Sequence, residues 1–350
     1  MARHHDTTQL AAGTSLMNTA ARPSLIAITL ATAAPALAAV LLTSIANAEP
    51  ILTRNQNPLL ALYGLPSPLP ARLPPTGGGR VAGVINWGNT EKEEFSADGR
   101  YTLDAETFEV RLHFNHAFAE RFALHAELPW RKVNEGSLDG FIDDWHGLFG
   151  LPEGSRPRLP EDQLLIEFEQ AGTTLLSIDE SSSGIGDIPL GLGYQLYATD
   201  GGALSTWLTV KAPTGSADDL TGSGAVDVAA TLAGQKQLNE HWQLFGHASV
   251  AWLGEGDLLP ELQESFAWTL MGGLTWNAWR ALDLTVQVEA NSRLYDGLDP
   301  ELDGDAIVLT FGGSWRTTGG WRYDVGVSED VQTGASPDIV FIFAVARDYR

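Results

Sequence analysis

Residues 282–294 read Leu-Asp-Leu-Thr-Val-Gln-Val-Glu-Ala-Asn-Ser-Arg-Leu, and apolar and polar side chains alternate along this stretch. A period of two is typical of a β-strand with one apolar and one polar face. Residues 106–115 and 121–130 repeat the pattern. Similar segments occur at 80–87, 186–197, 203–213, 224–236, 241–253, 264–277, 305–316, 320–328 and 338–348. The sequence therefore predicts an all-β domain over residues 80–350.

The predicted strands are about 10–13 residues long, whereas strands in soluble sheets most often have about 5–6 residues. A tilted strand of about 9–11 residues crosses a bilayer. Short turns, such as 116–120 and 237–240, alternate with longer acidic links, such as 88–100 and 131–162. Short turns at one end and long loops at the other are typical of outer-membrane barrels. We therefore predict an antiparallel transmembrane β-barrel.

The number of strands depends on residues 163–178, which contain two short β-rich segments around Ala171-Gly172. The C-terminal strand has to finish at the short-turn end, so this region must form a complete hairpin. If the hairpin projects from a loop, the barrel has twelve strands, which we favour; if it joins the wall, the barrel has fourteen. A soluble sandwich or a propeller of similar repeat length is the structural alternative, and either would bury the apolar faces in a core.

Tryptophans lie at the ends of the predicted strands. Trp242 and Trp252 share a face at opposite ends of one strand. Ten residues at a rise of ~3.3 Å and a tilt of ~45° span roughly 23 Å along the membrane normal, close to the apolar band of about 25 Å that aromatic residues border in such barrels. The predicted aromatic girdle consists of Trp130, Trp242, Trp252, Trp268, Trp276 and Trp321.

The N-terminus has the composition of a secretory signal. Basic residues are followed by an apolar run over 24–45 and then by Ala46-Asn47-Ala48. This order predicts a signal peptide over 1–48 with cleavage after Ala48. A membrane anchor is the alternative, because the run is long enough to span a bilayer.

Residues 49–79 form a proline-rich arm that ends in Gly77-Gly78-Gly79. Proline lacks the N–H that a helix interior or a central strand needs, so we expect extended backbone here. The arm precedes the first strand and therefore starts on the short-turn, periplasmic side. It either enters the lumen as a plug or remains a loose periplasmic tail.

Composition excludes several classes of function. The chain has 44 acidic and 21 basic residues and a net charge of −23, so it would repel nucleic acid. It has no cysteine, which excludes disulfides and cysteine-based zinc or redox sites. An acidic run could bind a hard divalent cation, but it lacks EF-hand spacing, and a solvated loop is the simpler interpretation. The run consists of Asp296, Asp299, Glu301, Asp303 and Asp305. We expect neither a metal site nor a cofactor.

Two groups of residues are candidate functional sites. The first lies on the predicted inward face of 106–130 and forms either a selectivity patch or a structural ion-pair network. Its members are Glu109, Arg111, His113, Arg121, His125 and Glu127. The second is the apolar stripe of a short helix predicted over 137–149, in the longest extracellular loop, with Ser137 as its N-cap. This helix forms a lid or packs on the barrel rim. The stripe consists of Phe141, Ile142, Trp145, Leu148 and Phe149.

An enzymatic alternative rests on Asp227, His247 and Ser249, which share the inward face. A hairpin turn near residue 238 would set Asp227 opposite Ser249 and one row from His247, and such residues can form a nucleophilic triad. Polar inward residues are neighbours in any barrel, however, and Ser249 does not lie in a Gly-x-Ser-x-Gly motif. We expect that the protein is not an enzyme, with a lipid hydrolase as the alternative.

Several short motifs occur in order along residues 55–348. They are Asn57-Pro58-Leu59, Tyr63-Gly64-Leu65-Pro66, Phe141-Ile142-Asp143-Asp144-Trp145-His146, Phe149-Gly150-Leu151-Pro152, Gly184-Ile185-Gly186-Asp187, Pro213-Thr214-Gly215, Gly222-Ser223-Gly224 with Asp227, and Ser336-Pro337-Asp338. Together they resemble an uncharacterised, domain-of-unknown-function family of Gram-negative outer-membrane β-barrel proteins. The chain is more distantly similar to FadL-type and phenol-degradation-associated transporters of hydrophobic compounds. The resemblance implies a barrel in the outer membrane.

The chain departs from such barrels at its end, Asp348-Tyr349-Arg350, because they usually finish with an aromatic residue that resembles an assembly signal. We predict a secreted outer-membrane barrel that passes a small, hydrophobic compound. Its expected partners are outer-membrane lipid and lipopolysaccharide, the barrel-assembly machinery and that compound. A structural or surface-interaction barrel that transports nothing is the main functional alternative.

Overall fold

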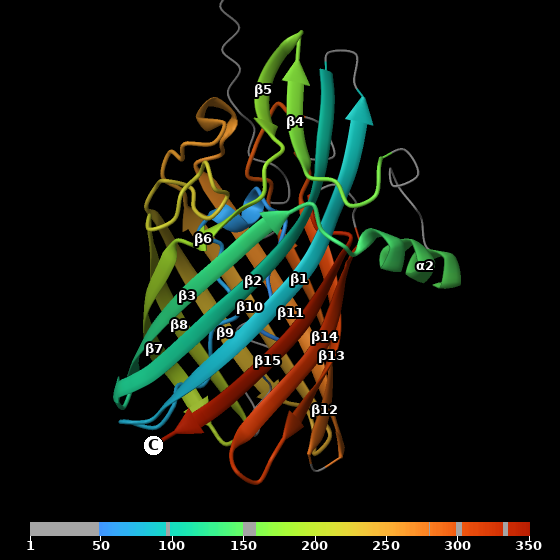
Figure 1. Cartoon of the computed structure of the whole chain (residues 1–350). Coiled ribbons are helices and arrows are strands. Elements are labelled where there is room, and N and C mark those ends of the chain that lie inside the picture. Colours follow the sequence, from blue (N-terminus) through green and yellow to red (C-terminus); the bar gives the residue numbers. More distant parts are fainter. Residues whose placement is uncertain (1–48, 96–98, 150–158, 280, 299–302, 332–334) are drawn as a thin grey trace, which may run out of the picture.

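The computed structural model describes residues 49–95, 99–149, 159–279, 281–298, 303–331 and 335–350. Within these residues, twelve antiparallel strands close into a barrel, because β1 (Gly79–Phe95) pairs with β2 (Gly99–Ala119) on one side and β15 (Ile339–Tyr349) on the other (Figure 1). The remaining wall strands are β3 (Phe122–Asn134), β7 (Ile188–Thr199), β8 (Gly202–Ala212), β9 (Asp227–Gln237), β10 (Trp242–Trp252), β11 (Phe266–Trp279), β12 (Leu282–Asn291), β13 (Ala306–Arg316) and β14 (Trp321–Asp330). The predicted signal peptide, 1–48, lies outside the described residues.

The wall has its apolar side chains on the outside. On β12, Leu284, Val286 and Val288 are exposed, whereas Thr285 and Gln287 between them are buried. Apolar side chains are exposed on the other strands too, but some inward positions are also apolar, such as Trp207 and Ile342. A sandwich or propeller would bury the apolar face instead, so both structural alternatives are wrong.

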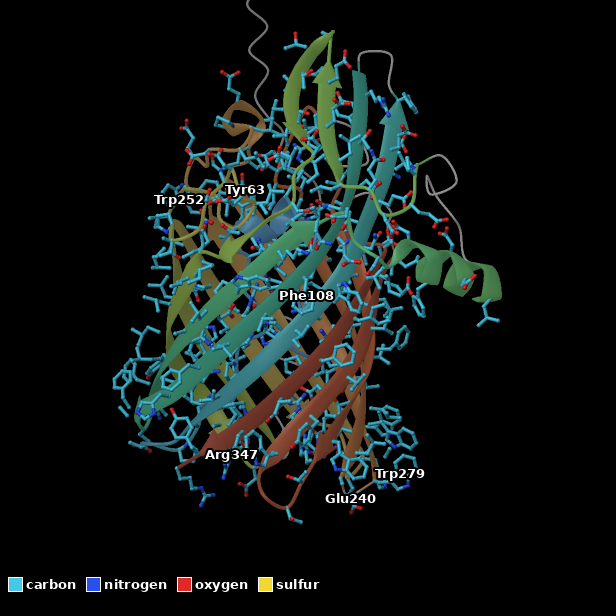
Figure 2. All side chains as sticks on the ribbon, viewed as in Figure 1. Tyr63, Phe108, Glu240, Trp252, Trp279 and Arg347 are labelled. Atoms are coloured by element: carbon cyan, nitrogen blue, oxygen red, sulfur yellow. The ribbon has the colours of Figure 1, made fainter. Side chains whose placement is uncertain are left out.

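The barrel has two unlike ends. At the short-turn end, tight turns join the strands, for example between β7 and β8, and the chain finishes at Arg350 (Figure 1). At the loop end the connections are longer. Trp242 and Trp276 stack on the outer surface with ring centroids 6.0 Å apart. Figure 2 shows Trp252 at the loop end and Trp279 at the short-turn end. Trp130, Trp242, Trp252, Trp276 and Trp321 are exposed, and Trp268 is half-buried.

The hairpin β1–β2 continues beyond the barrel wall, so the prediction of a loop at 88–100 is wrong. Residues Gly99–Asp104 of β2 pair with β4 (Leu165–Gln170), which pairs in turn with β5 (Thr173–Ile178). The strand persists despite its charge because Tyr101 packs beside its cross-strand partner Phe168 of β4, with ring centroids 5.9 Å apart. The β4–β5 hairpin thus stands outside the wall, and the count of twelve strands is confirmed. A further short strand, β6 (Ser182–Ile185), pairs with β3.

The predicted loop helix is present as α2 (Asp139–Phe149). It begins two residues after the expected start at Ser137. Ile142 is buried with Leu138 and Ile339, and Phe141 meets Phe341 edge-on at 5.5 Å. Figure 1 shows the helix beside the wall, which favours packing on the rim over a lid.

Leu148 on the same helix is 76% exposed, and the side chains of Trp145 and Phe149 lie outside the described part. In the described part of the chain, 3₁₀ turns occur at Leu60–Leu62 and Pro260–Leu262. No helix in the described residues is long and apolar enough to cross a membrane.

Candidate functional site

The arm, residues 49–79, lies inside the barrel. It rises from Glu49 at the short-turn end to a 3₁₀ turn at Leu60–Leu62, then descends to Gly79, where β1 begins. Most of its residues from Ile51 to Leu73 are buried. In Figure 2, Tyr63 lies near the loop end. The two limbs therefore occupy the lumen from one end to the other.

Arg54 shapes the tip of the arm. Its guanidinium donates to the carbonyl oxygens of Ala61 and Leu65, both at 2.9 Å, and of Tyr63 at 3.2 Å. These backbone groups face one another across the turn and have no strand partner, so one side chain satisfies three buried acceptors. Arg131 of β3 also donates to Ala61 O, at 2.9 Å, and ties the tip to the wall.

Apolar side chains seal the tip at the loop end. One buried cluster contains Leu59, Leu62 and Tyr63 of the tip. It also contains residues from the loop-end connections and from the β1–β2 extension. Tyr63 Oη lies 2.8 Å from Tyr295 Oη. Burial raises the pKa of Tyr63 to about 12, so the phenol stays protonated at neutral pH. The cluster also contains Leu60, Leu65, Tyr101, Leu103, Val133, Leu164, Ile166, Phe168, Leu220, Leu253, Leu294 and Leu298.

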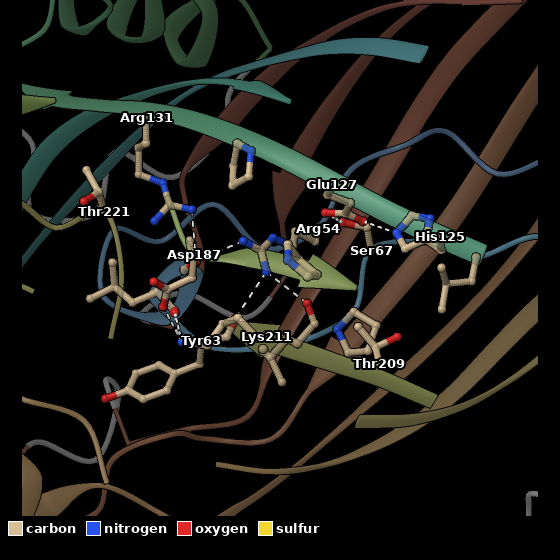
Figure 3. A pocket seen from close by; sticks show the side chains of 18 residues that line it. Arg54, Tyr63, Ser67, His125, Glu127, Arg131, Asp187, Thr209, Lys211 and Thr221 are labelled. Atoms are coloured by element: carbon tan, nitrogen blue, oxygen red, sulfur yellow. Dashed lines mark hydrogen bonds and ion pairs between the residues drawn. The ribbon is translucent and has the colours of Figure 1, made fainter. Parts of the chain in front are cut away.

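Lys211 of β8 joins the wall to the tip of the arm. Its Nζ pairs with Asp187 and lies 3.1 Å from Asp227 Oδ2. It also donates to Leu62 O in the arm, at 3.1 Å, while Asp227 accepts from Gly64 N at 2.7 Å. One buried ammonium and two buried carboxylates thus hold two backbone groups of the arm, and Figure 3 shows Lys211 beside Asp187, one of the two carboxylates.

The short motifs at 184–187, 213–215 and 222–224 meet around this lysine. Asp187 accepts from Gly215 N at 2.8 Å and from Ser223 N at 3.0 Å. A Cβ on Gly222 would lie 2.2 Å from Asp187 Oδ1, so the backbone can pass the carboxylate only if that residue is glycine. These motifs build the cage that orients Asp187 toward Lys211.

The descending limb is extended and proline-rich, so it makes no regular hydrogen bonds of its own. Side chains of the wall supply its partners. Ser205 Oγ and Trp207 Nε1 donate to Pro70 O at 2.6 and 3.1 Å. Gln195 donates to Ala71 O at 2.9 Å and accepts from Leu73 N at 2.8 Å. Each proline removes one N–H that the lumen would otherwise have to satisfy.

The predicted lumen patch comes together, with one exception. Arg111 pairs with Glu109 at 2.6 Å and with Glu127 at 2.8 Å, and all three side chains are buried. His113 and His125 flank Glu127, and Figure 3 shows His125 beside Glu127. Arg121 instead is exposed, and its guanidinium lies 3.4 Å from Tyr194 Oη. It lies in the turn between β2 and β3, where the alternation of inward and outward side chains no longer applies.

The patch contacts the arm as well as itself. Ser67 accepts from Arg111 at 2.6 Å and donates to Glu127 at 3.2 Å. Arg131 donates to Glu109 at 2.7 Å and so links the patch to the tip. These contacts favour a structural ion-pair network over a selectivity patch.

At the short-turn end, packing between the arm and the wall is incomplete. A cavity of about 380 Å³ lies between residues 49–52, residues 68–75 and the wall. Glu49 at its rim pairs with Arg80 at 2.5 Å and with Arg322. Burial alone would raise the pKa of Glu49, but the two guanidinium groups outweigh it and hold that pKa below its usual range.

The residues of the hydrolase alternative do not form a triad. Asp227 is bound to Lys211 and Gly64, Ser249 shares a 2.9 Å hydrogen bond with Thr231, and His247 Nε2 lies 2.6 Å from Leu69 O. The turn between β9 and β10 lies slightly later than predicted, so that Thr231, not Asp227, faces Ser249. In this register, Asp227, His247 and Ser249 do not come together as a catalytic triad.

The carboxylates of the acidic run that the structure describes accept from, or pair with, groups of the same loop. Asp296 pairs with Arg293 at 3.0 Å. Asp303 accepts from Gly297 N at 2.7 Å, and Asp305 accepts from Arg293 N at 3.3 Å. Asp299 and Glu301 lie outside the described residues.

Sequence patterns missed the residues that fix the arm: Arg54, Arg131 and Lys211. Their partners lie far away along the chain, so no local period reveals them. One signal for Lys211 was available in the sequence. It is an inward-facing lysine close to the glycine-containing motifs at 184–187, 213–215 and 222–224, and Asp187 and Asp227 lie in or beside them.

Among solved structures, the COG4313 outer membrane channel from Pseudomonas putida F1 is similar over 81% of this chain and 99% of its own, with 15% identity and a TM-score of 0.54. The KdgM porin matches 76% of this chain and 99% of its own at 10% identity and a TM-score of 0.41. The Pseudomonas putida toluene transporter TodX matches 84% and 91% at 11% identity and a TM-score of 0.38. The first of these shares the fold.

No curated protein sequence is significantly similar to this chain. The model of one family, described as protein of unknown function (DUF3187), matches residues 26–348. The motifs that cage Asp187 and those of the arm tip all lie within this range. The chain therefore belongs to the DUF3187 family, and its described residues fold as a twelve-stranded β-barrel.

Proposed function

We propose that the protein is an outer-membrane channel for a small, apolar compound and that its own arm keeps it closed. The observation that carries this proposal is an apolar outer wall around a polar lumen that residues 49–79 fill. The shared fold with an outer membrane channel supports it. Short turns of such barrels face the periplasm, so the arm enters from the periplasmic side.

The cavity supports the choice of an apolar compound. Its volume, about 380 Å³, falls within the range of about 300–1,000 Å³ that is usual for small-molecule sites. Leu52, Leu69, Leu73 and Phe245 supply apolar lining, and a few polar groups such as Gln235 can orient a ligand. Passage to the loop end requires the arm to move, since its tip fills that part of the lumen.

A surface-interaction barrel is the second candidate, and one observation favours it. The β1–β2 extension and the β4–β5 hairpin form a four-stranded sheet beyond the wall, which a simple channel does not need. Such a barrel would leave the lumen closed permanently.

Uptake of N-phenyl-1-naphthylamine by Gram-negative cells that express the chain tests the channel. Cells with a deletion of residues 51–76 should take up this apolar dye several-fold faster than cells with the full chain, and the full chain faster than an empty vector. Leu238→Ser, at an exposed position in the turn between β9 and β10, is the matched control and should equal the full chain. Heat-modifiable gel mobility verifies that each barrel is folded. If neither form raises dye uptake, the channel is rejected and the surface-interaction barrel is favoured.

A further inference from the structure

Three metal-ligating side chains lie together in the lumen, on the neighbouring strands β2 and β3. His113 is directly opposite Glu127, and Asn115 is opposite His125. Glu127 Oε1 lies 3.0 Å from His125 Nε2 and 3.5 Å from His113 Nδ1. All three side chains are buried, and their ligand atoms lie within 4.8 Å of one another.

The surrounding contacts leave these three atoms facing one another. Asn115 Oδ1 lies 2.9 Å from His125 Nδ1, and because this oxygen is an acceptor, the ring hydrogen is on Nδ1. A neutral His125 then presents the lone pair of Nε2 to a carboxylate oxygen. Glu127 is oriented through its other oxygen, Oε2, by Arg111 at 2.8 Å and Ser67 at 3.2 Å. Histidine ligands of metals are usually oriented in this way, through a hydrogen bond from the second ring nitrogen.

Access also suits a cation. The guanidinium groups of Arg111 and Arg131 pair with the carboxylates of Glu109 and Glu127, and Arg54 interacts with the same carboxylates, so an ion would be held by its direct ligands and not by local negative charge. The lone pair of His125 Nε2 and the carboxylate oxygen that it faces repel unless a proton or a metal ion lies between them. His113 and Asn115 line the cavity at the short-turn end, from which an ion and a fourth ligand can enter.

We propose that His113 Nδ1, His125 Nε2 and Glu127 Oε1 bind one divalent transition-metal ion of the Zn²⁺ class. Two imidazoles and one carboxylate with an open position are a common zinc ligand set, whereas Ca²⁺ and Mg²⁺ prefer oxygen ligands alone. The ion would bridge β2 and β3 beneath Ser67 of the arm. This proposal is independent of whether the barrel transports anything.

Titration of the untagged, detergent-solubilised full chain with Zn²⁺ and with Co²⁺ tests the site, after chelator treatment and dialysis. We expect one tightly bound ion per chain by calorimetry and the visible absorption of low-coordinate Co²⁺. His113→Gln and His125→Gln should each weaken binding by at least about tenfold, and Asn115→Ala by about 10–100-fold through loss of ligand orientation.

His247→Gln is the matched control, because this buried histidine lies in the same cavity but outside the cluster. It should bind Zn²⁺ as the unchanged chain does. Retained heat-modifiable mobility shows that a variant is folded. The proposal is overturned if the folded full chain binds no Zn²⁺ or Co²⁺, or if the His113 and His125 variants bind as tightly as the control. Either result would mean that hydrogen bonds alone organise the three side chains.

Discussion

The two ends of the lumen are filled by the same arm in different ways. At the loop end, the tip is enclosed by an apolar cluster and fixed by Arg54 and Lys211, both inside the barrel. At the short-turn end, a cavity of about 380 Å³ remains beside the limbs, and the ion pair of Glu49 is partly exposed, with 25% of the Glu49 side chain accessible. Buried charges are costly to separate, whereas exposed pairs contribute little. We therefore expect the tip of the arm to keep the lumen closed, and the base of the arm to detach from the wall more easily than the tip.

The largest effect of a single substitution is expected at Lys211. Lys211→Met keeps the length of the side chain but leaves Asp187 and Asp227 buried without their cation, which typically costs about 3–5 kcal/mol. The tip should detach, and trypsin should then cleave after Arg54, giving a new N-terminus at Asn55. N-terminal sequencing of the digested, folded barrel measures this. An arm as protease-resistant as in the unchanged chain would show that the lysine does not hold it.

A smaller effect is expected at Arg54. Arg54→Met removes a donor from three carbonyl oxygens in the tip, but Ala61 O keeps its bond from Arg131. Because water and local rearrangement can satisfy the other two, we expect a total loss of about 1–3 kcal/mol, the usual cost of one unsatisfied buried group. Thermal unfolding in detergent should shift down, but by less than in Lys211→Met. Arg72→Met, in the base of the arm, is the matched control. If both arginine variants unfold at the same temperature, the tip of the arm is held no more firmly than its base.

The descending limb should be less sensitive still, because its contacts are shared. Ser205→Ala removes one of two donors to Pro70 O and leaves Trp207 Nε1 in place. We expect a loss of about 1 kcal/mol or less in unfolding free energy. Trp207→Phe removes the other donor, and the double variant should lose more than the sum of the two single losses. Strict additivity would mean that the two donors act independently.

The smallest effect is expected at Glu49, and it depends on pH. The pKa of Glu49 is held below its usual range by Arg80 and Arg322, so its stabilisation is complete above the ordinary glutamate pKa of about 4.3. It is lost as the pH falls through the lower pKa of the folded state. Glu49→Gln should cost about 1 kcal/mol or less at pH 7, and the difference from the unchanged chain should vanish in strong acid. Melting curves at several pH values measure this, and a difference that grows toward acid would contradict the assignment.

Alternation and turn length were sufficient to predict the barrel and the side that faces inward, because these depend on local periodicity. They favoured twelve strands but left fourteen open, because periodicity does not show whether the hairpin at 163–178 joins the wall. Residues 88–100 were misassigned, since charge such as that of Glu93 and Glu94 suggests a loop and only the distant β4 shows that the segment is a strand. The contacts of Lys211 with Leu62 and Asp187 could not be predicted, because strand periodicity gives the face of a side chain but not its partner across a lumen. The register of Ser249 failed through a small error in the position of one turn.

Conductance of single molecules in planar lipid bilayers tests the central claim most directly, that residues 49–79 close the lumen. The full chain should be closed or open only briefly, whereas the folded barrel without residues 51–76 should conduct steadily at the same voltage, because a polar lumen then connects the two sides. Equal conductance of the two forms, whether open or closed, would contradict the account.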